Sequence, residues 1–324
     1  MTRGGHAGAL RSDRWGRPAV AAVVLAVVIW RLGAGPFLAA LRGVDGRAVL
    51  AAAAVVLVTT VCAAWRWTII ARCLGIRLSL PAAVTAYYRA VFLNLTLPGG
   101  VAGDVHRGLS HGREVRDVPR GLRSVVWERA AGQVVQAVLT IAVLLILPSP
   151  ARSSMPLVAG VAVAVAVAVV LAWRMGGKPG RSRWRTVRNG VARDIREGVL
   201  RRNALPAIVL SSAVVVAGHT GTFLIAARTA GVTVSVSRLL PLAMLSLLAM
   251  ALPSVAGWGP REGVTAWAFS AAGLTAAQGA ATAVAYGVLV LAASLPGSVV
   301  VVAERLPRRS ASNRAVRSRG ATDG

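Results

Sequence analysis

Long apolar runs recur along the whole of this chain, and they constrain its fold more than any other feature. Hydrophobic residues make up 56% of the 324 positions and charged residues only 15%, and the mean hydropathy is +0.64. A soluble domain of this length carries more charge. Because about 20 apolar residues in a helix cross the hydrocarbon core of a bilayer, the sequence predicts an all-α, polytopic integral membrane protein.

Six unbroken runs are long enough to be full transmembrane helices, and two further apolar segments are interrupted. The six runs are 18–38, 48–70, 124–147, 156–173, 204–226 and 280–303. The interrupted segments are 80–104 and 238–272, and the second is too long for one span but short for two. We therefore predict one membrane domain, residues 18–303, between a basic N-terminal tail (1–17) and a basic C-terminal tail (304–324).

The net charge of +26 comes almost entirely from arginine. Such a charge could suit nucleic acid, but these arginines gather in tails and in loops between apolar runs. That pattern is typical of cytoplasmic loops and also attracts anionic lipid headgroups. Loop 174–203 holds ten basic residues against two acids, although the predicted outer loop 31–47 also carries three arginines. We expect a cell-membrane location, both termini in the cytoplasm and no nucleic-acid partner.

With both termini on one side, the number of full crossings must be even, and the six unbroken runs satisfy this. The interrupted segments must then each enter and leave the membrane on the same side. We predict two re-entrant hairpins of broken helices: 80–104 entering from the cytoplasm and 238–272 entering from outside.

The two interruptions resemble each other: LPGGVAG at 97–103 and LPSVAG at 252–257. A match this short can arise by chance in a chain rich in Ala, Val and Gly, but opposite entry directions favour an inverted repeat, a recurrent transporter design. Non-helical backbone at membrane depth is tolerated only where it faces protein or water, so the breaks predict a polar cavity. The residues expected to break the helices are Pro98, Gly99, Gly100, Gly103, Pro253, Gly257 and Gly259.

An acid and an arginine follow each break: Asp104 and Arg107 after the first, Arg261 and Glu262 after the second. Asp104 could cap a half-helix, Pro260 suits a first helical turn, and Glu262 suits the positive end of a helix. Exposed N–H groups at such an end attract phosphate or carboxylate, and an arginine adds bidentate donors. The sequence leaves open the alternative that both pairs are simple ion pairs at the membrane interface.

Glu128 and Arg129 lie at the start of the third unbroken run. Gln133 and Gln136 follow on the same run. Glu128, Ala131 or Gly132, and Gln136 are spaced at three, four and eight, so one polar stripe could face the cavity. The alternative is that both charged residues lie in the headgroup layer. Asn94, just before the first break, could bond backbone groups that the break frees.

The remaining polar residues give weaker signals. We expect His219 to form a helix–helix hydrogen bond rather than to relay protons, and the aromatic pairs in 65–67 and 87–88 to lie in interfacial belts. Cys62 and Cys73 show no metal or disulfide spacing. No metal or cofactor motif is present in the sequence, so neither a metal nor a cofactor is expected.

Three ordered motifs resemble those of a known membrane family. FLNLTLPGGVAGDVHRG, VVWERAAG and LPSVAGWGPREG are similar to the signatures of the flippase-like transmembrane domain of lysylphosphatidylglycerol synthases. The resemblance covers residues 18–303. Ala102, where the family often has a third glycine, and Trp258 depart from its pattern.

The resemblance implies translocation of an anionic or aminoacylated phospholipid or a lipid-linked intermediate, with anionic phospholipids as membrane partners. The lipid phosphate would lie near the Asp104–Arg107 and Arg261–Glu262 pairs, with Glu128 and Arg129 as a charge gate. The alternative is a non-transporting partner subunit of a glycosyltransferase or of an aminoacyl-lipid pathway. The 21 residues after the last run leave no room for the soluble aminoacyltransferase domain, so we expect that this chain is not an enzyme.

Overall fold

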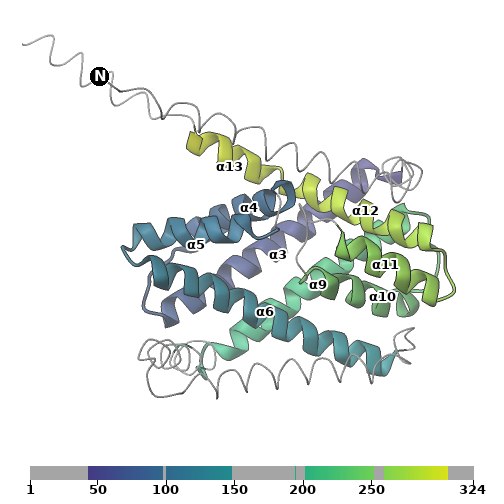
Figure 1. The fold of residues 1–324 in the computed structure, drawn as a ribbon, viewed down its shortest axis with the longest axis horizontal. Helices are drawn as coiled ribbons and strands as arrows, with labels where there is room; N and C mark the ends of the chain where they lie inside the picture. Colours follow the sequence, from purple (N-terminus) through teal and green to yellow (C-terminus); the bar gives the residue numbers. More distant parts are fainter. Residues whose placement is uncertain (1–42, 98–99, 148–193, 195–200, 252–258, 306–324) are drawn as a thin grey trace, which may run out of the picture.

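The structure, a computed structural model, is helical throughout the residues that it describes, with no strand among them (Figure 1). These residues are 43–97, 100–147, 194, 201–251 and 259–305. The helices are α3 (Gly46–Cys73), α4 (Leu80–Thr96), α5 (Ala102–Glu114), α6 (Val118–Ile146), α9 (Leu205–Thr229), α10 (Val236–Ala249), α11 (Pro260–Ala271), α12 (Ala276–Ser294) and α13 (Pro296–Arg305). The all-α prediction is confirmed for this part of the chain.

Four of these helices, α3, α6, α9 and α12, are long and apolar enough to cross a membrane. The first three correspond to the predicted spans 48–70, 124–147 and 204–226. Helix α6 begins earlier than predicted because Asp117 caps it, accepting a bond from the Arg120 N–H at 3.0 Å. The predicted spans 18–38 and 156–173 lie outside the described residues.

The predicted last span, 280–303, corresponds to α12 but extends too far at its C-terminal end. Two helices occupy this stretch, α12 and α13, and they meet at Leu295 directly before Pro296. Proline has no N–H to donate and its ring clashes with the preceding turn, so it suits a first helical turn better than an interior. Hydropathy did not reveal the boundary because the run is apolar on both sides of it.

Both predicted breaks are present as interruptions between paired helices, and Figure 1 shows the pairs at opposite ends of the bundle. Helix α4 packs against α5, and α10 packs against α11. Gly100 and Gly259 have positive φ angles of 64° and 116°, which glycine adopts without strain. Pro98, Gly99, Pro253 and Gly257 lie outside the described residues. Re-entrance into a membrane and the inverted repeat stay predictions.

The basic stretch 104–123, between the first break and the third unbroken run, is helical and packed. Helix α5 contacts α4 on one side and α6 on the other. Its buried stripe includes Asp104, Arg107, Gly108 and His111, spaced at three, four and seven as one helical face requires. The face is polar, so the apolar periodicity that normally marks a packed helix is missing from the sequence.

Helices α3 and α9 pack against each other at the centre, and apolar side chains gather around two parts of this pair. One cluster joins the early part of α3 and the late part of α9 to α10, α11 and α12, around Phe223, Phe269 and Tyr286. The other joins the later part of α3 to α4 and α6, around Trp67 and Tyr87. The polar site lies among helices drawn from both clusters.

Helices α4 and α5 approach so closely that only glycine fits at residue 103, where an added Cβ would lie 2.1 Å from the Ala90 carbonyl oxygen. We therefore expect Gly103→Ala to destabilise the protein by about 1–3 kcal/mol, the usual cost of overpacking. A lowered melting temperature of the purified protein would show this.

Gly263→Ala is the matched control, since residue 263 also lies in the first turn of the helix after a break and has open space around its missing Cβ. It should leave the melting temperature unchanged or raise it slightly. Equal losses in both variants would contradict the close-packing explanation.

Candidate functional site

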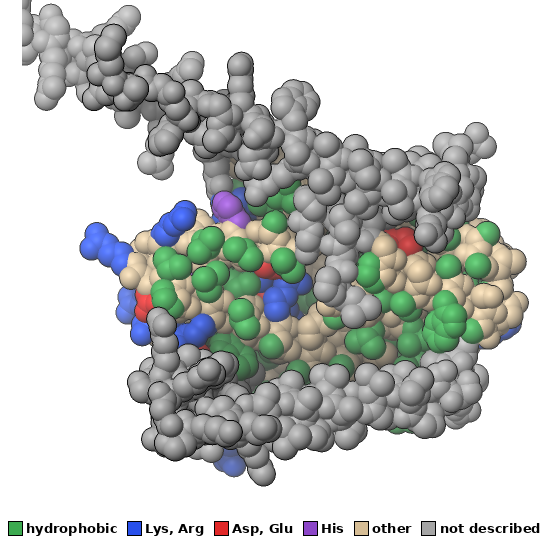
Figure 2. All heavy atoms as spheres, in the orientation of Figure 1, with side chains coloured by type: hydrophobic (Ala, Val, Ile, Leu, Met, Phe, Trp, Pro, Cys, Tyr) green, Lys and Arg blue, Asp and Glu red, His purple; other side chains and the backbone are tan. Residues whose placement is uncertain are grey.

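A cavity of about 230 Å³ lies among α3, α4, α6, α9 and α11, and the described ends of both breaks reach it, at Gly100 and at Pro260. Figure 2 shows basic and acidic side chains gathered in the middle of one face, surrounded by apolar ones. The polar side chains of the lining are Thr59, Thr60, Arg66, Tyr87, Asn94, Arg129, Gln133, Gln136, Ser212, His219 and Arg261.

The Glu128 carboxylate is fully buried behind this lining. One of its oxygens accepts bonds from both Nε (3.0 Å) and Nη2 of Arg66 and from the Tyr87 hydroxyl at 2.8 Å. The other oxygen accepts from Arg107 Nη2 at 2.6 Å. Arg66 also donates to the Ser212 hydroxyl at 2.9 Å. One carboxylate on α6 therefore connects α3, α4 and α5, and reaches α9 through Arg66.

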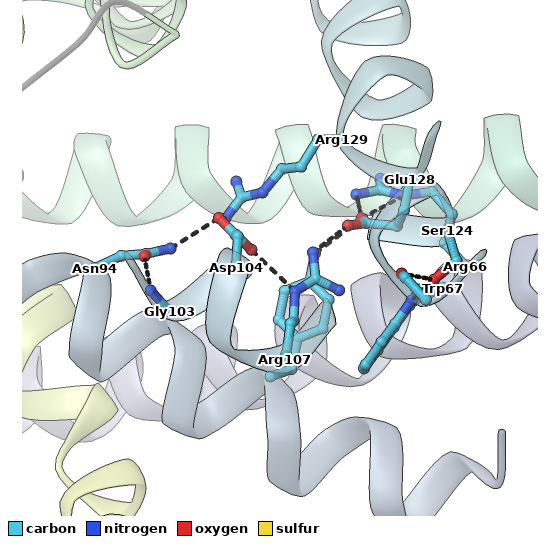
Figure 3. A network of polar contacts seen from close by, with 11 residues as sticks. Arg66, Trp67, Asn94, Gly103, Asp104, Arg107, Ser124, Glu128 and Arg129 are labelled. Carbon is cyan, nitrogen blue, oxygen red and sulfur yellow. Dashed lines mark hydrogen bonds and ion pairs between the residues drawn. The ribbon is translucent and has the colours of Figure 1, made fainter. Parts of the chain in front are cut away.

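Asp104 continues the same network (Figure 3). Its carboxylate accepts from Arg107 Nε at 2.9 Å, from Arg129 Nη2 at 2.5 Å and from the Asn94 amide at 2.9 Å. The Asn94 side-chain oxygen accepts from the Gly103 N–H at 2.7 Å, so Asn94 bonds backbone freed by the break, as predicted. Asp104 lies in the first turn of α5 rather than at its cap.

Arg107 is the buried centre of the network. Its guanidinium carbon lies 4.6 Å from the centre of the Trp67 ring and 4.3 Å from that of Tyr87, distances at which a cation is attracted to an aromatic face. Its side chain is fully buried and does not line the cavity. Arg107 therefore holds the two carboxylates in place without facing the cavity itself.

The assignment of both aromatic pairs to interfacial belts is wrong for Trp67 and Tyr87, which are 0% and 6% exposed. Successive helical positions turn by about 100°, so Trp65 and Trp67 face different sides of α3. Trp65 is 39% exposed, whereas the Trp67 indole donates to the Ser124 hydroxyl at 3.0 Å.

A second, smaller cluster begins at the second break. Glu262 accepts from Arg261 Nε at 3.0 Å and from the Gly259 N–H at 2.6 Å, so it caps α11 as predicted. Arg261 lies over the Tyr286 ring, 4.9 Å from its centre. The Tyr286 hydroxyl bonds Nδ1 of His219 at 2.8 Å, which confirms the predicted helix–helix bond of His219.

The seven residues predicted to bind substrate thus lie around one cavity, three in its lining and four behind the lining. Asn94, Arg129 and Arg261 line the cavity. Asp104, Arg107, Glu128 and Glu262 lie behind the lining, bonded to its members or to each other. The predicted ion pairs exist, but within a buried network, and Glu128 lies inside the helix bundle.

Sequence reasoning missed Arg66, Tyr87 and Ser212. Arg66 carried a usable signal, because an ionisable residue inside an apolar run is a functional candidate by default. Gly132 carried another: a Cβ there would lie 3.0 Å from Arg66 Nη2, so glycine on α6 leaves room for that guanidinium. Tyr87 and Ser212 carried none, because their partners are set only by helix packing.

The charges do not balance within the larger cluster. Among the described residues, three guanidinium groups (Arg66, Arg107 and Arg129) meet two carboxylates (Asp104 and Glu128), which leaves one positive charge. Arg261 and Glu262 balance each other. Arg66 and Arg129 line the cavity, whereas neither Asp104 nor Glu128 is part of its described lining, so the cavity is suited to an anion.

We expect Glu128→Gln to destabilise the protein by about 3–5 kcal/mol, because removing one partner of a buried ion pair leaves uncompensated charge. Thermal or denaturant unfolding of the purified protein measures this. Arg120→Gln breaks an ion pair with Asp117 between partly exposed side chains and should cost only about 0–1 kcal/mol. A loss for Glu128→Gln no greater than that of this control would contradict a buried ionic centre.

Comparisons with known proteins agree with the membrane fold. Neither the curated proteins nor the solved structures include a significant match to this chain. A family model described as lysylphosphatidylglycerol synthase TM region matches residues 14–297, most of the chain. The chain therefore belongs to the lysylphosphatidylglycerol synthase TM region family, and is a membrane protein tied to lipid handling.

Proposed function

We propose that this protein is a lipid flippase, which moves an anionic or aminoacylated phospholipid, or a lipid-linked intermediate, between leaflets. One observation carries the proposal: three arginines line a cavity inside a bundle of apolar helices. Ionisable residues inside a membrane protein are costly and mark substrate pathways. A lipid phosphate supplies the negative charge that this lining lacks.

Arg129 is the residue best placed to meet the phosphate. Its side chain is 44% exposed and lines the cavity. Among the described residues its polar partner is Asp104, which engages only Nη2, so Nη1 and Nε are available to a ligand. A guanidinium binds phosphate through paired N–H donors. Arg66 and Arg261 are bonded to carboxylates behind them and add positive potential to the same space.

A phosphate bound to Nη1 and Nε of Arg129 would share this guanidinium with Asp104, which holds Nη2, and would weaken the attraction between the two side chains. Asp104 also bonds Asn94, which holds the Gly103 N–H at the start of α5. Loosening the contact between Arg129 and Asp104 therefore acts directly on the first helix break. Through this coupling, a bound headgroup can change how α4 and α5 pack, which is the kind of local change that alternating access requires.

The outer surface of α6 suits the acyl chains of such a lipid. Its exposed large apolar residues are Val126, Val134, Val138, Ile141, Leu145 and Ile146. The same helix turns Arg129, Gln133 and Gln136 toward the cavity. A lipid could thus keep its chains against the outside of α6 while its headgroup enters the polar interior.

The proposal includes no catalytic step. Glu128 and Asp104 each accept bonds from two arginines, and Glu262 accepts from Arg261 and from the cap of α11. Carboxylates whose oxygens already accept bonds from arginines and from a helix cap are suited to positioning those groups rather than to a reaction step.

Reconstitution into liposomes tests the transport claim. Purified protein should move fluorescent phosphatidylglycerol between leaflets, measured as the fraction that a membrane-impermeant quencher reaches. Arg129→Gln should slow this movement about tenfold or more, since a hydrogen bond to a charged group contributes about 1.5–3 kcal/mol. Arg129 is partly exposed, so its loss should leave the fold intact.

Arg113→Gln is the matched control, because Arg113 is exposed on α5 and does not line the cavity. Its transport rate should equal that of the wild type. Equal rates for wild type and Arg129→Gln would rule out the assigned phosphate site. A wild-type protein that moves no lipid but co-purifies with a membrane enzyme would favour the partner-subunit alternative.

A further inference from the structure

We infer that the cavity selects a lipid headgroup that is net negative and carries hydroxyl groups, and that it rejects a cationic, aminoacylated headgroup. The inference rests on the proposed function, and it narrows the substrate class of the same site. Three features carry it: the charge of the lining, the position of the acids, and two amide side chains beside Arg129.

The described lining of the cavity carries positive and neutral polar groups but no carboxylate. The nearby acids are each already bonded to arginines: Asp104 to Arg107 and Arg129, Glu128 to Arg66 and Arg107, and Glu262 to Arg261. The segment 252–258, which joins α10 to α11, contains no acidic residue. An ammonium group entering this space would meet guanidinium groups with no anionic partner to offset the repulsion.

Gln133 and Gln136 lie on the same face of α6 as Arg129, at spacings of four and seven. A helix rises 1.5 Å per residue, which places them about 6 Å and about 10 Å along the axis from Arg129. Both line the cavity. The structure gives neither amide a hydrogen-bond partner among the described residues, so both keep their donors and acceptors for a ligand.

An amide matches a hydroxyl well, because each group both donates and accepts a hydrogen bond. On the opposite side of the cavity, His219 uses Nδ1 for Tyr286 and lines the cavity itself. A phosphodiester at Arg129 therefore places the hydroxyl groups of a glycerol-like headgroup beside Gln133 and Gln136. An aminoacyl ester on the same headgroup would instead bring its ammonium group among these amides and the arginines.

Lipid binding to the full-length purified protein tests the inference separately from transport. Native mass spectrometry would compare three lipids with identical acyl chains: phosphatidylglycerol, phosphatidylmethanol and lysylphosphatidylglycerol. Phosphatidylmethanol keeps the anionic phosphodiester but has no hydroxyl group. We expect phosphatidylglycerol to bind about fivefold more tightly than phosphatidylmethanol, the effect of about one net hydrogen bond. Lysylphosphatidylglycerol should bind more weakly than either.

Two variants test whether Gln133 and Gln136 produce this headgroup preference. Gln133→Leu combined with Gln136→Leu should remove the preference for phosphatidylglycerol, while phosphatidylmethanol binding, which depends on Arg129, stays near the wild-type level. Gln136→Glu should increase binding of lysylphosphatidylglycerol and decrease that of phosphatidylglycerol, because it places a carboxylate on the lining. This second variant is a gain of binding, which a misfolded protein cannot mimic.

The possible outcomes distinguish the inferred headgroup selectivity from the proposed transport function. A wild-type protein that binds the three lipids equally, or that prefers the lysyl lipid, overturns the inference but leaves an anion-binding lipid transporter in place. A wild-type protein that binds none of them contradicts the proposed function as well. The predicted order of the three lipids, together with its reversal in Gln136→Glu, would establish the selectivity.

Discussion

The buried carboxylate of Glu128 is the interaction on which the site depends. A lone ionised carboxylate in an apolar bundle would be very costly. Arg66, Arg107 and Tyr87 offset that cost together, and each comes from a different helix. Helices α3, α4, α5 and α6 must therefore pack in one arrangement for all three donors to reach the same group. The requirement fixes the walls of the cavity more tightly than non-directional apolar contacts could.

The charged residues of the site occupy two positions, the cavity wall and the layer behind it, and this arrangement makes the cavity electropositive. The acids lie behind and orient the arginines, whereas Arg66, Arg129 and Arg261 reach the cavity wall. Of these three arginines in the described lining, Arg129 is the one with substantial exposure. In the proposed function, Arg66 and Arg261 add positive potential to the cavity, and Arg129 binds the phosphate.

The two helix breaks link the ionic contacts of the site to the backbone. At the first break, Asn94 bonds both the freed Gly103 N–H and the Asp104 carboxylate. At the second, Glu262 bonds both the Gly259 N–H and Arg261. In each case one polar side chain satisfies the backbone and holds an ionic partner of the site. A change in the ionic contacts therefore acts directly on the backbone hydrogen bond at the break.

The sequence by itself determined the apolar helices, the two breaks and the residues around them, because these follow from local rules. Hydropathy over about 20 residues located α3, α6 and α9, and Pro260 with Glu262 marked the start of α11. The same rules failed for α5, whose packed face is polar, and at Pro296, where the run stays apolar across the boundary. Only the tertiary structure decided the partners: Arg66 and Glu128 are 62 residues apart, and nothing local distinguishes their pairing from others. Which arginine faces the cavity and which is buried depends on how the helices pack, because a guanidinium pairs with whichever carboxylate the fold brings within reach.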